Sequence, residues 1–179
     1  MLRTTNVDEI NQIEIIPNVI RRRLQKECKE VQNNYDEISV EYSQESKILV
    51  TFIKRGDTYI FTIPKNYPFE SPKMMINGID QNKLFNLRTK RFITILKYVS
   101  GFDCLCCNSY LCRNNWSPAV TLNRVINQIE AYKNYKYFIF LKLISDKIKE
   151  KYLNIDIDLD SWLFTVCSPR ECYAGDPIH

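Results

Sequence analysis

Apolar residues between positions 18 and 76 follow first a helical spacing and then a strand spacing. The helical stripe consists of Ile20, Leu24, Cys28 and Val31. Intervals of three and four residues place such side chains on one face of an α-helix. From residue 38 onward apolar and polar residues alternate, which is typical of strands with one buried face. The pattern predicts a helix after Pro17 and then a four-stranded antiparallel meander, with strands at 38–42, 48–52, 59–63 and 73–76.

Prolines interrupt this pattern between the third and fourth strands. Residues 63–73 read IPKNYPFESPK, and each proline removes a backbone donor and restricts the residue before it. This segment is therefore predicted to be a stiff turn. Residues 1–13 show no clear period and are interpreted as a loose leader, and residues 77–103 as an insertion of undetermined structure.

A second helical pattern follows Trp116. Its apolar stripe is Leu122, Val125, Ile126 and Ile129. Ser117 is predicted to cap this helix and Pro118 to enter its first turn. Residues 135–152 are predicted to form a further, aromatic-rich helix. The fold class expected is α+β, as one domain over 1–179 with its core at about 18–130 and a helical C-terminal extension at 131–179.

Composition narrows the function classes. The chain has 179 residues, 45% of them hydrophobic, and a net charge of +4, which is too weakly basic for a dedicated nucleic-acid binder. No apolar run approaches the roughly 20 residues of a membrane span, and the polar start lacks the apolar centre of a secretory signal. The 7 cysteines are then expected to be reduced thiols in the cytoplasm, with the nucleus as the alternative. Abundant Asn, Ile, Lys and Tyr are typical of an AT-rich genome.

Two short motifs resemble those of the ubiquitin-conjugating enzyme family. Tyr67-Pro68-Phe69, with its flanking prolines, is similar to the family's Tyr-Pro-Phe turn, and Trp116-Ser117-Pro118-Ala119 is similar to its Trp-Ser-Pro-Ala segment. The helix before them also resembles the family's first helix, so the resemblance covers roughly residues 18–130. It implies the ubiquitin-conjugating fold and a transferase that carries ubiquitin or a ubiquitin-like protein as a cysteine thioester.

The resemblance also suggests a nucleophile. A thiolate is a strong nucleophile that forms an activated acyl intermediate. The family's cysteine precedes the tryptophan by about eight residues, and a one-residue insertion brings Cys107 into register, nine residues before Trp116. Cys106 and Cys104 are the alternatives. No resident cofactor is implied, because ATP is used only by the upstream activating enzyme.

The family's His-Pro-Asn signature is missing. The only histidine is His179, and the corresponding stretch is residues 97–103. Because the family's Asn is thought to stabilise the oxyanion, and one lost oxyanion donor costs roughly 100- to 1000-fold in rate, turnover requires a substitute. Ser100, Asn108 and Asn114 are candidates by proximity.

The four cysteines between residues 104 and 112 are also candidates for a metal site. Cys104, Cys106, Cys107 and Cys112 match the four-sulfur count of a zinc site, although adjacent cysteines close a tetrahedron less easily than the usual Cys-x2–4-Cys pairs. The alternative hypotheses are therefore a catalytically inactive variant of the fold that binds ubiquitin or a ligase, with structural or zinc-bound cysteines, and an unrelated zinc-stabilised α+β domain.

The resemblance also implies partner surfaces. The ligase-facing residues correspond to Phe69, Pro118 and Ala119, and an exposed Phe between prolines suits an interface anchor. The activating enzyme would meet the basic face of the first helix. That face consists of Arg21, Arg22, Arg23 and Lys26. The partners expected are ubiquitin or a related modifier, the activating enzyme and a ubiquitin ligase, without membrane or nucleic acid.

Overall fold

The computed structural model describes residues 2–4, 10, 16–42, 47–85 and 89–151. The chain is an α+β protein whose residues group into two compact units. Unit 1 comprises residues 1–87 and 104–132, and unit 2 comprises residues 88–103 and 133–179. The predicted core boundary at about residue 130 lies close to the end of unit 1. Residues 152–179 of the predicted C-terminal extension lie outside the described residues.

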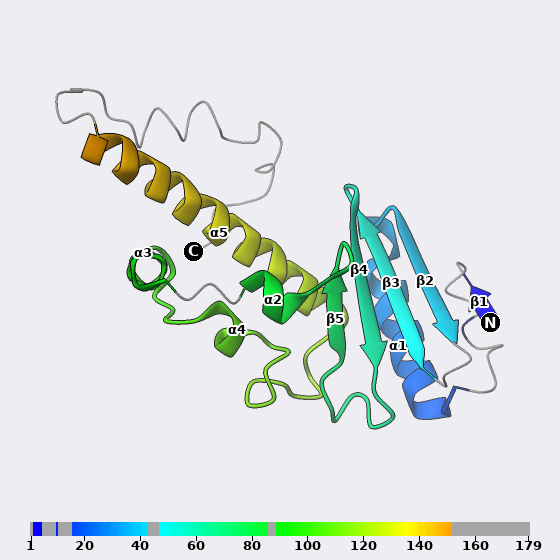
Figure 1. Ribbon diagram of the computed structural model, residues 1–179. Helices are drawn as coiled ribbons and strands as arrows, with labels where there is room; N and C mark the ends of the chain where they lie inside the picture. The colour runs from blue at the N-terminus through cyan, green and yellow to red at the C-terminus, as the bar shows by residue number, and fades with distance from the viewer. Residues whose placement is uncertain (1, 5–9, 11–15, 43–46, 86–88, 152–179) are drawn as a thin grey trace. The chain divides into compact units, whose positions relative to one another are not determined.

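Unit 1 contains an antiparallel sheet of six strands in sequential order (Figure 1). The strands are β1 (Leu2–Thr4), β2 (Glu37–Tyr42), β3 (Ile48–Lys54), β4 (Asp57–Ile63), β5 (Lys73–Ile76) and β6 (Ile79–Asp80). The four predicted strands are confirmed as β2 to β5. The predicted number of four is wrong for the sheet, because β1 pairs with β2 and β6 with β5. Residues 2–4 are thus a strand and not part of a loose leader.

The buried face of the sheet follows from its register. Val50 of β3 pairs with Phe61 of β4, which pairs in turn with Met74 of β5. All three side chains are buried. The neighbouring row places Phe52 against Tyr59. These rows are the apolar positions of the alternating pattern, so the period-two signal identified the core face correctly.

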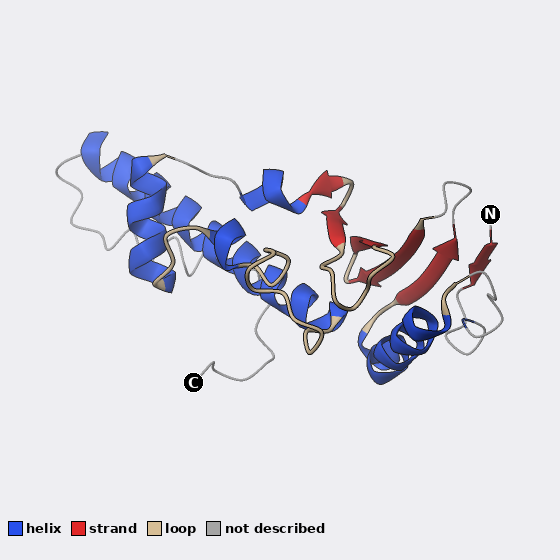
Figure 2. Cartoon of the chain, turned by 90° about the horizontal axis from the view of Figure 1, so that it is seen from below, coloured by secondary structure: helices blue, strands red, loops and turns tan. Residues whose placement is uncertain are grey.

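The helix α1 (Asn18–Val31) runs along one face of the sheet, and the 3-10 turn η2 (Gln32–Asn34) follows it (Figures 1 and 2). The four residues of the predicted stripe are all buried. Tyr35 then places its ring 5.0 Å from that of Phe52. Glu27 is also buried, at 4% exposure, although it is not one of the four predicted stripe residues.

Unit 1 also includes α2 (Gln81–Phe85), α4 (Leu105–Asn108) and the first turns of α5 (Leu122–Lys151). The start predicted for the helix after Trp116 is wrong, because Ser117 does not cap α5. Its carbonyl accepts a 3.0 Å hydrogen bond from the backbone N–H of Val120, which closes a turn before the helix. Thr121 is the capping residue, because its Oγ1 accepts from the N–H of Arg124 at 3.3 Å.

The two helices predicted after Trp116 are one. No proline or glycine occurs from 122 to 151, so nothing interrupts the backbone hydrogen bonds of α5. In unit 2 the later part of α5 is accompanied by α3 (Lys90–Ser100). Arg91 of α3 forms ion pairs with Asp146 at 3.3 Å and Glu150 at 2.8 Å. None of the described helices combines the length and apolar character needed to cross a membrane.

Candidate functional site

The turn that carries Tyr67 and Phe69 buries one aromatic ring and exposes the other. The backbone N–H of Tyr67 donates to Pro64 O at 3.1 Å, and that of Phe69 donates to Asn66 O at 2.8 Å. Tyr67 is 2% exposed, whereas Phe69 is 77% exposed. The proline-rich segment is therefore an ordered turn, as predicted, that anchors one ring in the core and presents the other to solvent.

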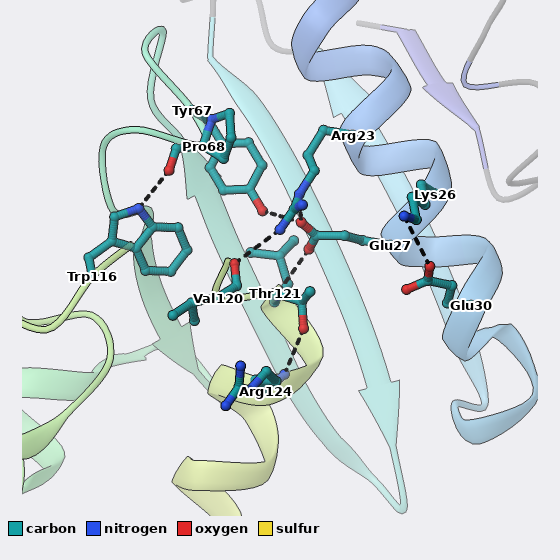
Figure 3. Close-up of polar contacts among 11 residues, drawn as sticks. Arg23, Lys26, Glu27, Glu30, Tyr67, Pro68, Trp116, Val120, Thr121 and Arg124 are labelled. Atoms are coloured by element: carbon teal, nitrogen blue, oxygen red, sulfur yellow. Dashed lines mark hydrogen bonds and ion pairs between the residues drawn. The ribbon is translucent and has the colours of Figure 1, made fainter. Parts of the chain in front are cut away.

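Trp116 joins this turn to the second motif. Its indole Nε1–H donates a 2.8 Å hydrogen bond to the carbonyl of Pro68, as Figure 3 shows. Its ring also lies 6.1 Å from the ring of Tyr67. These two contacts bring the two motifs into one structural feature. Pro118 and Ala119 follow within three residues and are both exposed. We call this feature the corner pair: residues 66–70 and 116–120.

Glu27 holds the corner pair to the first helix (Figure 3). Its Oε1 accepts a 2.7 Å hydrogen bond from the hydroxyl of Tyr67 and contacts Nε of Arg23. Its Oε2 accepts from the backbone N–H of Leu122 at 2.8 Å. This N–H begins α5 and has no partner within the helix, and a negative charge is favourable at a helix N-terminus. One buried carboxylate therefore ties together α1, the Tyr67 turn and the start of α5.

The buried Tyr67 hydroxyl makes the fold sensitive to alkaline pH. Burial, and then the Glu27 carboxylate, raise the pKa of Tyr67 above its ordinary value of 10.0. A raised pKa in the folded state means that stability is complete below pH 10 and falls as the pH rises beyond it. The free energy of unfolding of the wild type should decrease between pH 8 and pH 11, and that of Tyr67→Phe should decrease by about 1 kcal/mol less. Urea unfolding at both pH values measures this difference, and parallel losses in variant and wild type would contradict it.

The predicted ligase-facing residues are all at the surface. Phe69, Pro118 and Ala119 are exposed. Phe69 also borders two hollows of the surface. One, of about 540 Å³, is lined by Phe69, Glu70, Ser71, Arg113 and Trp116. The other, of about 530 Å³, includes Val19 of α1 together with Tyr67 and Phe69. An exposed aromatic ring between two hollows suits a contact with a partner protein.

The basic residues of α1 differ in their surroundings. Arg22 and Lys26 are exposed, and Arg21 is half-buried. Lys26 lies 3.8 Å from Glu30. Arg23 points into the fold, where it contacts Glu27 and donates a 3.2 Å hydrogen bond to the carbonyl of Val120. Of the four residues predicted to meet an activating enzyme, Arg23 is thus engaged within the chain, whereas Arg22 and Lys26 are accessible.

The candidate nucleophiles lie together around α4. Cys104 precedes this short helix, and Cys106 and Cys107 are within it. Their three Sγ atoms all lie within 4.8 Å of one another. Cys107 is exposed, Cys104 and Cys106 are half-buried, and none of them forms a disulfide. Cys112 is half-buried as well.

These thiols differ in how readily they ionise. Burial raises the pKa of Cys106 to about 12, and the hydrogen bond with Cys104 raises the pKa of Cys107. For Cys104 burial also acts upward, but hydrogen bonds from Cys106 and Cys107 outweigh it and lower the pKa. A thioester acceptor needs exposure and easy ionisation in one residue. Here Cys107 has the exposure and Cys104 the lowered pKa.

Of the oxyanion donors proposed from the sequence, Asn108 ends α4 directly after Cys107, and Asn114 follows in the same unit. Ser100 belongs to α3, where its hydroxyl donates to Leu96 O at 2.8 Å. Asn115 instead approaches the cysteine loop: its Nδ2 donates to Cys107 O at 2.8 Å and to Ser109 O at 3.1 Å. Gln128 of α5 accepts from the N–H of Tyr110 at 2.8 Å. Asn115 lies next to Trp116 and Gln128 between apolar stripe positions, but nothing in a single sequence singles out either amide.

No protein-family model matches the chain, and no match is found among curated proteins or among solved structures.

Proposed function

We propose that the chain is a divergent protein of the ubiquitin-conjugating type that binds a ubiquitin ligase through its corner pair. The single observation that carries the proposal is the 2.8 Å hydrogen bond from the Trp116 indole to Pro68. It joins the two motifs on which the resemblance rests, which are 48 residues apart in the sequence. The α+β order of α1, the β2–β5 meander and the helix after Trp116 is compatible with the same family.

The corner pair has the properties of an interface anchor. Phe69 is held by a turn with three internal backbone hydrogen bonds and is joined to the second motif through Pro68 and Trp116. A ring fixed in this way loses little conformational entropy when a partner covers it. Pro118 and Ala119 supply a small, rigid apolar surface in the same feature. Together they suit an apolar pocket on a ligase.

Truncating Phe69 tests the proposal. Phe69→Ala should weaken binding to a purified ubiquitin-ligase domain by about 30-fold, because a central aromatic anchor contributes roughly 2 kcal/mol or more. The unfolding midpoint should hardly change, since the ring is exposed. Tyr98→Ala is the matched control, because Tyr98 is 91% exposed on α3 and outside the corner pair. Affinities are measured by titration calorimetry against a panel of such domains.

Two outcomes would contradict the proposal. Equal affinities for wild type and Phe69→Ala would remove Phe69 from the interface. A panel in which no ligase domain binds the wild-type chain would count against ligase binding itself.

Thioester transfer stays a prediction from the sequence. In that reaction a cysteine sulfur attacks the activated C-terminal carbonyl of ubiquitin, and the activating enzyme's thiol leaves. The absence of His-Pro-Asn from the sequence favours binding over transfer as the main activity. Incubation with activating enzyme, ATP and ubiquitin, followed by a non-reducing gel, tests it. A reducible adduct that is lost in Cys107→Ala would establish transfer.

A further inference from the structure

The cysteines around α4 are not explained by packing. Free cysteines in proteins are commonly small buried hydrophobes, and Cys28 of α1, which is fully buried, is an example. Cys107 is exposed, and Cys104, Cys106 and Cys112 are only half-buried. A group of thiols that converge near the surface without filling the core indicates a different role.

The sulfur positions are close to those of a metal site. The Sγ atoms of Cys104, Cys106 and Cys107 lie within 4.8 Å of one another, and those of Cys104 and Cys106 are 2.8 Å apart. In a tetrahedral zinc site with Zn–S bonds of about 2.3 Å, neighbouring sulfurs are about 3.8 Å apart. Opening the Cys104–Cys106 pair by about 1 Å would therefore produce this spacing.

The backbone at Cys104 brings the cysteines of α4 together although Cys106 and Cys107 are adjacent in the sequence. Cys106 and Cys107 are adjacent, which normally hinders binding to one ion. Cys104, however, has extended backbone with φ −158° just before α4, so its side chain returns toward both of them. The three thiols converge even though they lie within four residues.

Cys112 is connected to the same group through Asn115. The side chain of Asn115 donates to Cys107 O at 2.8 Å, and its backbone N–H donates to Cys112 O at 2.9 Å. One residue thus fixes the backbone of both cysteines. Cys112 N–H also donates to Ser109 O at 2.9 Å. The Sγ of Cys112 is not among the three that lie within 4.8 Å of one another, so the fourth thiol joins them only when its side chain or this segment moves toward α4.

The loop is anchored independently of any metal. Leu105 and Leu111 are buried on either side of the exposed Cys107. Gln128 of α5 contacts the loop twice, by accepting from Tyr110 N–H at 2.8 Å and donating to Asn108 O at 3.2 Å. Such support orients ligands before an ion arrives and raises its affinity.

From this arrangement we infer that Cys104, Cys106, Cys107 and Cys112 bind one Zn²⁺ ion. Binding forms four Zn–S bonds, and the four thiols release four protons to the solvent. No oxidant or reductant is involved. The site is structural, because four protein ligands leave no open position on the ion. The inference does not depend on ligase binding, but it excludes a thioester on Cys107 while the ion is bound.

The test uses the full chain, refolded without metal and then titrated with Zn²⁺. Elemental analysis after dialysis should give one zinc per chain. Four thiols should become protected from a thiol reagent, with rates lowered by about tenfold or more, because only free thiolates react readily. Co²⁺ in place of Zn²⁺ should give the intense visible bands of tetrahedral thiolate coordination. Unchanged thiol reactivity in the wild-type chain would overturn the inference, and this readout requires no variant to fold.

Variants identify the ligands. Cys104→Ser and Cys112→Ser should each lose stoichiometric zinc. Cys28→Ala should retain it, as should the double variant Cys167→Ser/Cys172→Ser, whose positions lie outside the described residues. Full zinc binding by Cys112→Ser would overturn the four-thiolate site. Loss of zinc only in the Cys167/Cys172 variant would place the site elsewhere in the chain.

Discussion

Replacing Glu27 with alanine is expected to lower the free energy of unfolding by about 3–5 kcal/mol, the range seen when one partner of a buried charged pair is removed. The variant leaves the buried Tyr67 hydroxyl and the first N–H of α5 without their acceptor. It also leaves the Arg23 guanidinium without its carboxylate. Unsatisfied buried groups cost about 1–3 kcal/mol each. Urea unfolding monitored by circular dichroism measures the loss.

Glu30→Ala is the matched control for this experiment. Glu30 lies one turn further along α1, is exposed, and only approaches Lys26 at 3.8 Å. Its removal should change stability by no more than about 0.5 kcal/mol. Glu27→Gln should fall between the two, because the amide oxygen still accepts a hydrogen bond but the charge at the helix N-terminus is lost. Equal stability of Glu27→Ala and Glu30→Ala would show that Glu27 does not hold the corner pair.

The second large loss of stability is expected when Trp116 is replaced by alanine. Trp116→Ala removes the ring contact with Tyr67 and the hydrogen bond to Pro68. Large aromatic truncations cost about 3–5 kcal/mol when the ring is fully buried, and the half-buried Trp116 should cost about 2–3 kcal/mol on the same scale. Because the Tyr67 turn would lose its fixed position, ligase binding should weaken in parallel, even though Phe69 is retained.

Trp116→Phe separates the two contributions. It keeps an aromatic ring near Tyr67 but removes the indole donor, so the loss of stability should be only about 1 kcal/mol. Unfolding and ligase titration are measured on the same samples. If Trp116→Ala unfolded at the wild-type urea concentration and bound a ligase domain as tightly, the link between the two motifs would be unimportant.

The strands could be predicted from the sequence because their signal is local. Strict alternation marked Val50, Phe61 and their neighbours as the buried face, and the structure buries them. The hairpin to β6 was predictable but missed: Asn77 and Gly78 both have positive φ, 49° and 78°. Asn-Gly is the typical sequence of a two-residue hairpin turn. Helix α3 was missed as well, although Thr89 caps it and Gly101 ends it with φ 74°.

The site was predicted less completely because its contacts are distant in sequence. Glu27 bonds to Leu122 across 95 positions, and no local pattern reveals such a pair. One signal was present: Glu27 lies at i+7 from Ile20, within the apolar stripe of α1. A carboxylate on a buried stripe indicates a polar partner. The convergence of the thiols depends on the extended backbone at Cys104, which spacing alone does not specify.

Chemical-shift mapping shows whether the corner pair is the partner-facing surface of the protein. A purified ubiquitin-ligase domain that binds the chain is titrated into the ¹⁵N-labelled protein. We expect the largest amide shifts at residues 66–70 and 116–120, and we expect Phe69→Ala to abolish them at the same ligase concentration. Shifts concentrated instead on α3, or on the exposed residues of β5 and β6, would contradict it.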